Sequence, residues 1–261
     1  MKLPLYWVDA FTAKVFAGNP AGVVPLAAWP EDALMQRIAF ENGLSETAFF
    51  VATGPGRYHL RWFTPAVEVE LCGHATLAAA FVIFNQLGFA GAEITFNSRS
   101  GPLRVTRRGE RLELDFPAQP AVAVAPNEAL ARALGLSPLL TFRAATRWMA
   151  VYNNAREIAT IQPDHALLAR IVPGRISITA PGDDCDFVSR MFIPDAGIPE
   201  DPVTGSAHCT LTPYWAERLG KTKLHARQVS ARGGELWCEL VEDRVRIAGH
   251  AVLYLQGEIV G

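Results

Sequence analysis

The sequence lacks long apolar runs, paired cysteines and an excess of either charge. No run approaches the roughly 18 apolar residues that a membrane-spanning helix needs. The net charge is −2 without a long basic or acidic run, so we expect neither nucleic acid nor a membrane surface as partner. The first residues also lack the layout of a signal peptide, and we expect a cytoplasmic protein. The cysteines show no paired spacing, which favours free thiols over disulfides, and they are Cys72, Cys185, Cys209 and Cys238.

Several cofactor and nucleophile motifs are also missing. The sequence has no G-x-G-x-x-G after a strand, no phosphate-binding loop and no G-x-S-x-G. Cys72 and His74 bracket a glycine turn, whereas His208 and Cys209 are adjacent and would diverge on a helix. Neither arrangement is a usual zinc spacing, so we expect no metal and no cofactor.

The chain does contain enough apolar residues for a full core. It has 261 residues, of which 50% are hydrophobic and 19% charged, sufficient for one large or two modest domains. Residues 75–87 are almost all apolar. They predict a helix that other elements must surround, because it has no face suited to water.

Apart from Asn85 and Gln86 near its end, the polar groups of this predicted helix lie at its start, at Gly73, His74 and Thr76. The first amides of a helix have no partner within it and favour an anion. The start of a buried helix is therefore a suitable place to hold a carboxylate.

The order of elements in the first half returns weakly in the second. Each half has predicted strands, a small helix, and then a glycine turn before a mainly apolar helix, at Gly73-His74-Ala75 and Gly205-Ser206-Ala207. In the second half we expect strands near 140–152 and 157–161 and a helix from Asp164 to Ile171. The simplest assembly is two similar α+β units whose central helices point their N-termini into a shared cleft suited to a small carboxylate.

Prolines mark the expected boundary between the two units, at Pro117, Pro120 and Pro126. We therefore predict an N-terminal domain over 1–117 and a C-terminal domain over 118–261. As an alternative for the end of the chain, we consider that it packs back on the first domain.

Four positions could carry chemistry, and each also has an ordinary structural interpretation. Glu46 is either a solvated loop residue or a carboxylate at the rim of an apolar site, able to act as general base and then acid. His74 is either a satisfied buried histidine or a neutral imidazole that contacts a ligand. Asp201 is either a turn residue or a second acid, opposite Glu46, that anchors the ligand or holds His74. Ser206 offers a hydroxyl beside the Gly205 amide, or is only a helix cap.

Motifs along the whole chain resemble the PhzF-like (phenazine biosynthesis-like) isomerase family. They occur in family order and are Val8-Asp9-Ala10-Phe11-Thr12, Phe16-Ala17-Gly18-Asn19-Pro20-Ala21, Leu44-Ser45-Glu46-Thr47, Leu71-Cys72-Gly73-His74-Ala75-Thr76, Leu114-Asp115-Phe116-Pro117, Glu200-Asp201-Pro202-Val203-Thr204-Gly205-Ser206-Ala207-His208, Pro213-Tyr214-Trp215-Ala216 and Ala231-Arg232-Gly233-Gly234.

The resemblance implies a diaminopimelate-epimerase-like fold, with two pseudo-symmetric domains that each wrap a barrel-like sheet around a central helix. It implies a cofactor-independent isomerase that moves a proton on a small amino- or hydroxycarboxylic acid, and relatives are often homodimers. Carried over by motif, the catalytic residues are Glu46 as the acid/base, His74 and Asp201. The substrate-binding residues are Ser45, Gly73, Gly205 and Ser206.

Cys72 departs from the founding isomerase, which has a small residue before Gly-His. Related racemases and epimerases use two thiols, one at each central helix start, and Cys72 could be one of them. No cysteine occupies the matching place in the second half, since Cys209 lies further into the helix. We rank the single glutamate above a Cys72-dependent racemase, and keep a non-catalytic protein that binds a small metabolite as the third alternative.

Overall fold

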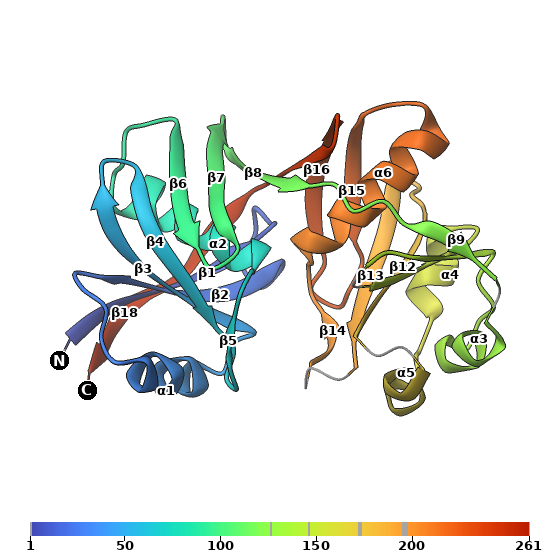
Figure 1. Cartoon of the computed structure of the whole chain (residues 1–261), viewed down its shortest axis with the longest axis horizontal. Helices are drawn as coiled ribbons and strands as arrows, with labels where there is room; N and C mark the ends of the chain where they lie inside the picture. Colours follow the sequence, from blue (N-terminus) through green and yellow to red (C-terminus); the bar gives the residue numbers. More distant parts are fainter. Residues whose placement is uncertain (1, 126, 146, 172–173, 195–197, 261) are drawn as a thin grey trace. The chain divides into compact units, whose positions relative to one another are not determined.

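The computed structural model describes residues 2–125, 127–145, 147–171, 174–194 and 198–260 (Figure 1). The expected boundary residue Pro126 lies outside this range. The chain forms two compact units, one of Met1–Asp115 with Ala248–Gly261, and one of Phe116–Ile247. The C-terminal strand therefore belongs to the first unit. No described helix is long and apolar enough to cross a membrane.

The first unit is a mixed sheet built around one helix. Its hydrogen-bonded strands follow one another as β18, β1, β2, β3, β4, β6, β7 and β8, and β5 adds to β4. Helix α1 (Asp32–Asn42) connects β2 to β3 and ends at Gly43, in the left-handed conformation that favours glycine. The strands are β1 (Lys2–Ala10), β2 (Asn19–Leu26), β3 (Glu46–Gly54), β4 (Arg57–Phe63), β5 (Glu68–Val69), β6 (Glu93–Ser98), β7 (Gly101–Arg108), β8 (Arg111–Pro117) and β18 (Ala251–Val260).

The second unit pairs its strands β9 to β13 in chain order, and β15 then joins β13 and β16. Small helices connect its strands, namely α3 (Glu128–Leu134), α4 (Ala155–Thr160) and α5 (His165–Ile171). The strands are β9 (Val122–Val124), β10 (Leu140–Arg143), β11 (Arg147–Val151), β12 (Arg175–Pro181), β13 (Phe187–Ile193), β14 (Ile198–Asp201), β15 (Lys223–Gln228), β16 (Gly234–Val241) and β17 (Arg244–Gly249).

Strand pairing makes the internal repeat explicit. In the first unit β1 and β2 pair antiparallel, β2 and β3 parallel, β3 and β4 antiparallel, and β4 and β6 parallel. In the second unit β10 and β11, β11 and β12, β12 and β13, and β13 and β15 follow the same alternation. Strands β2 and β11 are therefore equivalent, as are β3 and β12.

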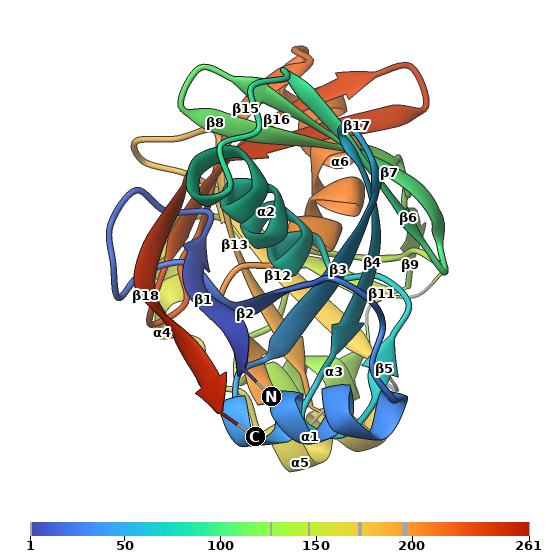
Figure 2. The same cartoon turned by 90° about the vertical axis from the view of Figure 1, so that its left-hand side faces the viewer.

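Helix α2 (Gly73–Phe81) is the core of the first unit. All its residues from Gly73 to Ala80 are buried, and Figure 2 shows strands around it. A π-helical segment, η1 (Val82–Gln86), continues it, so the single helix predicted over this stretch has a wider final turn. The uninterrupted apolar run is thus explained by burial on every side.

Helix α6 (His208–Leu219) follows a 3₁₀ turn, η2 (Gly205–Ala207), in the second unit. Its first two turns are buried, whereas Glu217, Arg218 and Leu219 are exposed. Trp215 anchors it, because its Nε1 donates to Thr179 Oγ1 at 2.9 Å and its ring stacks on Phe187 at 5.6 Å.

The strand expected near 157–161 is wrong, because residues 155–160 form helix α4. The Asn154 side chain accepts from the Glu157 amide at 3.0 Å and caps the helix. This local cap decides the conformation of a segment whose apolar residues also suit a strand.

Candidate active site

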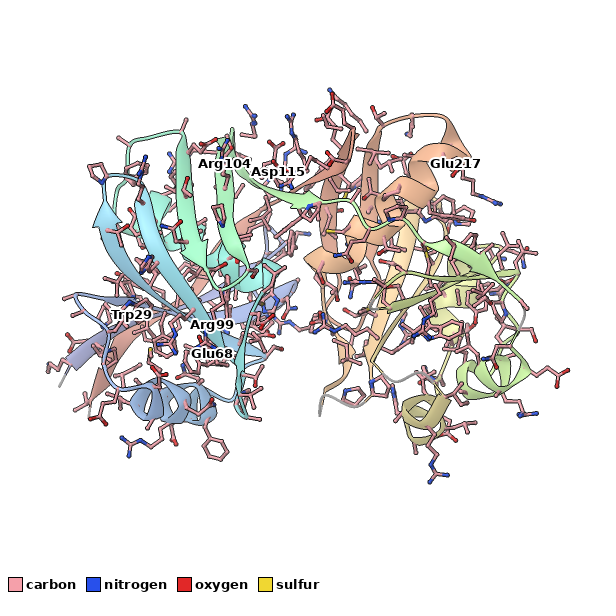
Figure 3. All side chains as sticks on the ribbon, in the orientation of Figure 1. Trp29, Glu68, Arg99, Arg104, Asp115 and Glu217 are labelled. Carbon is pink, nitrogen blue, oxygen red and sulfur yellow. The ribbon has the colours of Figure 1, made fainter. Side chains whose placement is uncertain are left out.

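The glycine turn of the first unit is held from both sides. Cys72 precedes α2, and its carbonyl accepts from the Thr76 amide at 3.1 Å and from Thr76 Oγ1 at 2.5 Å. Upstream, Glu68 on β5 pairs with Arg61 at 2.7 Å. It also pairs with Arg99 at 2.8 Å, and Figure 3 labels Glu68 and Arg99. These contacts fix the backbone that presents Gly73 and His74 at the helix start.

Glu46 and Asn19 reach this turn from the starts of two neighbouring strands. Glu46 is the first residue of β3 and pairs with Ala21 of β2. Asn19 opens β2 directly after Gly18, whose φ is +67° and whose added Cβ would lie 2.2 Å from the Ala10 carbonyl oxygen. Only glycine fits this turn, and the turn sets where Asn19 enters the sheet.

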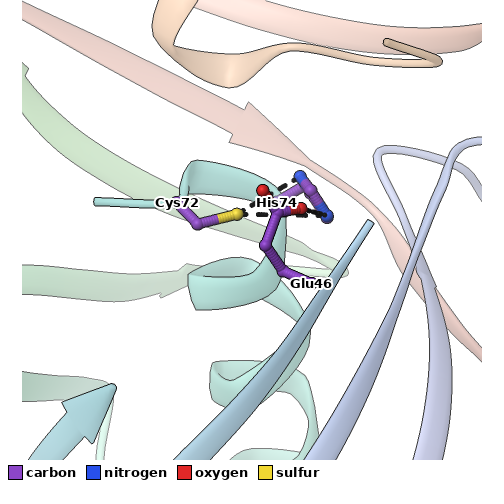
Figure 4. Close-up of side chains that lie close together, drawn as sticks. All are labelled: Glu46, Cys72 and His74. Atoms are coloured by element: carbon purple, nitrogen blue, oxygen red, sulfur yellow. Dashed lines mark hydrogen bonds and ion pairs between the residues drawn. The ribbon is translucent and has the colours of Figure 1, made fainter. Parts of the chain in front are cut away.

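His74 contacts three side chains at the helix start, and Figure 4 shows two of them, Glu46 and Cys72. Its Nε2 lies 3.2 Å from Glu46 Oε2, and its Nδ1 lies 3.1 Å from Asn19 Nδ2 and 3.5 Å from Cys72 Sγ. The Glu46 side chain is 19% exposed and that of His74 only 6%. The carboxylate therefore remains within reach of a ligand while the imidazole is enclosed.

Burial and charge shift the titration of this cluster in defined directions. Burial lowers the pKa of His74, but the Cys72 sulfur and the Glu46 carboxylate raise it by more, so it lies well above the ordinary value. Burial, and then the Glu46 carboxylate, raises the pKa of the Cys72 thiol. His74 therefore favours its protonated form beside Glu46, whereas Cys72 favours the neutral thiol.

The Glu46, Cys72 and His74 donor atoms lie within 4.8 Å of one another, which is close enough to share a metal ion. A metal would need Cys72 as the thiolate and a neutral His74, the forms that their pKa shifts disfavour. The arrangement suits proton transfer better, and the absence of a metal stays a prediction.

Asp201 ends β14 in the second unit, within a small hydrogen-bonded group. Its Oδ2 accepts from Thr204 Oγ1 at 2.5 Å. Gln228, which is buried, donates from Nε2 to the Asp201 carbonyl at 2.7 Å and accepts from the Thr204 amide at 2.8 Å. The β15 residue Gln228 thereby fixes the backbone between Asp201 and the second glycine turn.

Ser206 lies inside the 3₁₀ turn η2 after the buried Gly205, and Thr204 occupies the cap position. The alternative that Ser206 is only a helix cap is therefore wrong. Its Oγ accepts from Arg147 Nη2 at 3.4 Å. His208 donates from Nδ1 to the Thr204 carbonyl at 2.9 Å, and burial lowers its pKa to about 4, so it is neutral.

The structure thus brings Glu46 and His74 into contact, with Gly73 beside them and Ser45 next to Glu46 in the chain. Asp201, Gly205 and Ser206 lie in the second unit around Thr204. Sequence reasoning missed Asn19 as a partner of His74, because a Gly-Asn-Pro sequence is typical of an ordinary turn. It also missed Gln228 and Arg147, which no motif singles out.

Comparison with known proteins identifies the family of the chain. The family model described as phenazine biosynthesis-like protein matches residues 8–257. An uncharacterized isomerase of Pseudomonas aeruginosa is 52% identical over 259 residues, covering 99% of both chains. The crystal structure of a PhzF-family phenazine biosynthesis protein of Enterococcus faecalis has 47% identity and a TM-score of 0.97, covering 100% of both chains.

A more distant structure extends the likeness of fold. A hydroxyproline epimerase of Agrobacterium vitis has a TM-score of 0.64 at 11% identity, covering 99% of this chain and 92% of that one. The predicted α+β, diaminopimelate-epimerase-like fold is confirmed. From its motifs, its fold and its relatives, the chain belongs to the PhzF-like, phenazine biosynthesis-like family of isomerases.

Proposed function

We propose that this protein is a cofactor-independent isomerase that moves a proton on a small amino- or hydroxycarboxylic acid, with Glu46 as the general acid/base. The observation that carries the proposal is the contact between Glu46 Oε2 and His74 Nε2 at 3.2 Å, at the start of a buried helix. A partly exposed carboxylate held by an enclosed imidazole is oriented for repeated proton transfer.

In the proposed reaction, Glu46 removes a proton from a carbon next to an electron-withdrawing group. The C–H electron pair delocalises into the conjugated acid, and the protonated Glu46 returns the proton to another carbon on the same face. His74 acts as a positioning residue that holds the carboxylate, while the amides of Gly73 and His74 favour a negatively charged group.

The substrate class is supported by chemistry and by a distant relative. The hydroxyproline epimerase structure contains trans-4-hydroxy-L-proline, an acid with both an amino and a hydroxyl group. Asp201 offers a carboxylate beside Thr204 that would anchor an amine or hydroxyl of such a substrate. Ser45, Gly205 and Ser206 complete the proposed binding residues.

Solvent exchange tests the reaction. We would incubate the protein in D₂O with a panel of small amino and hydroxy acids and follow mass gain by mass spectrometry. Glu46→Gln should lower exchange by about 10³-fold, because it removes the proton carrier. The exposed Glu41→Gln is the matched control and should exchange as the wild type does. A folded Glu46→Gln protein with undiminished exchange would eliminate the mechanism.

A Cys72-dependent racemase remains the second candidate, because Cys72 Sγ lies 3.5 Å from His74 Nδ1. The raised pKa of this thiol and the buried place of Cys209 within α6 favour the glutamate. Cys72→Ala should therefore change the exchange rate by less than about tenfold. Loss of exchange in Cys72→Ala, together with protection of Cys72 from alkylation by substrate, would instead establish the thiol mechanism.

A non-catalytic metabolite-binding protein would show saturable binding without any isotope exchange. The domain boundary, the shared cleft, the cytoplasmic location and a homodimer also stay predictions. Analytical ultracentrifugation measures the last of these directly.

A further inference from the structure

Arg147 is a buried cation with very little hydrogen bonding. It opens β11 and is 4% exposed. Among the residues that the structure describes, its side chain makes one hydrogen bond, the long contact from Nη2 to Ser206 Oγ at 3.4 Å. Within the described part of the chain, Nε and Nη1 have no partner. Enclosed guanidinium groups ordinarily have carboxylate or carbonyl partners, so this side chain needs an explanation.

Arg190 shows what a structural arginine looks like in the same unit. It is 8% exposed, comparable with Arg147. Its Nε and Nη2 donate to Glu200 at 2.7 and 2.8 Å, and its Nη1 donates to the carbonyls of Ile158 and Ile161 at 3.0 and 2.7 Å. Each side-chain nitrogen of Arg190 has a partner, whereas Nε and Nη1 of Arg147 have none among the described residues.

Of the described residues, the two whose charge shifts the pKa of Arg147 provide no counter-ion. Burial lowers its pKa to about 10, Cys209 raises it and Arg175 lowers it further, so the side chain stays protonated at neutral pH. Burial raises the pKa of Cys209 to about 11, so that neighbour is a neutral thiol. The group that acts on Arg147 with a full charge is thus another cation, Arg175.

The internal repeat places Arg147 at the start of a strand beside the second glycine turn. Arg147 pairs with Arg175 where β11 and β12 begin, as Ala21 pairs with Glu46 near the starts of β2 and β3. Gly205-Ser206-Ala207 in turn corresponds to Gly73-His74-Ala75. In this register Arg147 matches Ala21, two residues after Asn19. The Arg147–Ser206 contact still joins a glycine turn to the first residue of a strand, as the contact of Asn19 with His74 does, with a cation in place of an amide.

We propose that Arg147 and Ser206 form a carboxylate-binding site that anchors the acid group of the substrate. Nε–H and Nη2–H of Arg147 would donate to the carboxylate from one edge of the guanidinium, as the same two groups of Arg190 donate to Glu200. Ser206, whose Oγ lies 3.4 Å from Nη2, would add its hydroxyl. That the bound carboxylate belongs to the substrate rests on the function proposed above. The binding of a carboxylate to Arg147 does not.

Arginine side-chain NMR tests the binding with acetate, the smallest stable carboxylate probe. In ¹⁵N-arginine-labelled protein, the Nε–H resonance absent from Arg147→Lys is that of Arg147. It should shift saturably as acetate rises to about 100 mM at constant ionic strength. The neutral isostere acetamide should leave it in place, as acetate should leave the Arg190 resonance. Ser206→Ala should weaken binding about fivefold. An Arg147 resonance unmoved by acetate would overturn the proposal.

Thermal stability, measured without any ligand, distinguishes a binding role of Arg147 from a structural one. Arg147→Met removes an uncompensated buried charge and should keep or raise the Tm. Arg190→Met leaves Glu200 unpaired and should lower the Tm clearly. If Arg147→Met lowers the Tm as much as Arg190→Met does, Arg147 has a structural role and the proposal is overturned.

Repeating the titration in Glu46→Gln distinguishes this proposal from the proposed function. Acetate should shift the Arg147 resonance with unchanged affinity, because Glu46 is not one of the ligands. Intact acetate binding without isotope exchange on any acid in the wild type would refute the isomerase function alone. Exchange that persists with wild-type KM in Arg147→Met would refute the substrate anchor alone.

Discussion

The two glycine turns occupy corresponding places in the internal repeat and differ in their electrostatics. In the first unit, Gly73-His74-Ala75 faces the carboxylate of Glu46, and His74 is drawn toward its protonated form. In the second unit, Arg147 lies beside Ser206, and the nearby His208 is held neutral by burial. The internal repeat thus preserves the position of the glycine turn. The residue at the start of the neighbouring strand, Glu46 in one unit and Arg147 in the other, sets the charge beside it. Under the two proposals above, the first turn serves proton transfer and the second holds an anion.

The largest effect on stability should distinguish the two central helices. Leu77 in α2 is completely buried, whereas Leu219 at the end of α6 is 42% exposed. Leu77→Ala should lower the free energy of unfolding by about 2–5 kcal/mol, since it leaves a cavity in the core of the unit. Leu219→Ala should change it by no more than about 0.5 kcal/mol. Urea unfolding measures both, and equal losses would contradict the difference in burial between the helices.

The next effect concerns His208 at low pH. Burial holds its folded pKa near about 4, below the ordinary 6.5, so between these values only the unfolded chain binds the proton. Its stability contribution is present above about pH 6.5 and should fall by about 3 kcal/mol as pH drops to 4. Unfolding free energies of wild type and His208→Gln across this range measure the difference. Parallel pH profiles would show that His208 is not the group responsible.

His74 should make the free energy of unfolding depend on pH in the opposite direction to His208. Its folded pKa is raised above 6.5, so the folded state keeps a proton that the unfolded state releases. The stability from its pair with Glu46 is therefore complete below about pH 6.5 and is lost as pH rises through the folded pKa. Wild type should lose more stability on this rise than His74→Gln. Glu46→Gln should behave like His74→Gln if the carboxylate is the cause.

Much of the fold follows from local sequence. The apolar stretch of residues 75–87 identifies a buried helix, and the structure buries Gly73–Ala80 throughout. The capping residue Asn127 and the stop at Gly43 occur where side-chain chemistry and left-handed backbone require them. The conformation of residues 155–160 was harder to predict, because their apolar residues suit both a strand and a helix. Only the Asn154 cap decides in favour of the helix.

The candidate site likewise has residues that the sequence predicts and contacts that only the tertiary structure decides. The sequence by itself predicted Glu46, His74, Asp201 and Ser206 as site residues, since these residues lie in family motifs, and their roles stay predictions. Tertiary structure alone decided that Glu46 contacts His74, and that Asn19 and Arg147 approach the two turns. Those contacts depend on which strands lie next to one another. Local sequence does not encode that pairing, because it arises from hydrogen bonds between segments far apart in the chain.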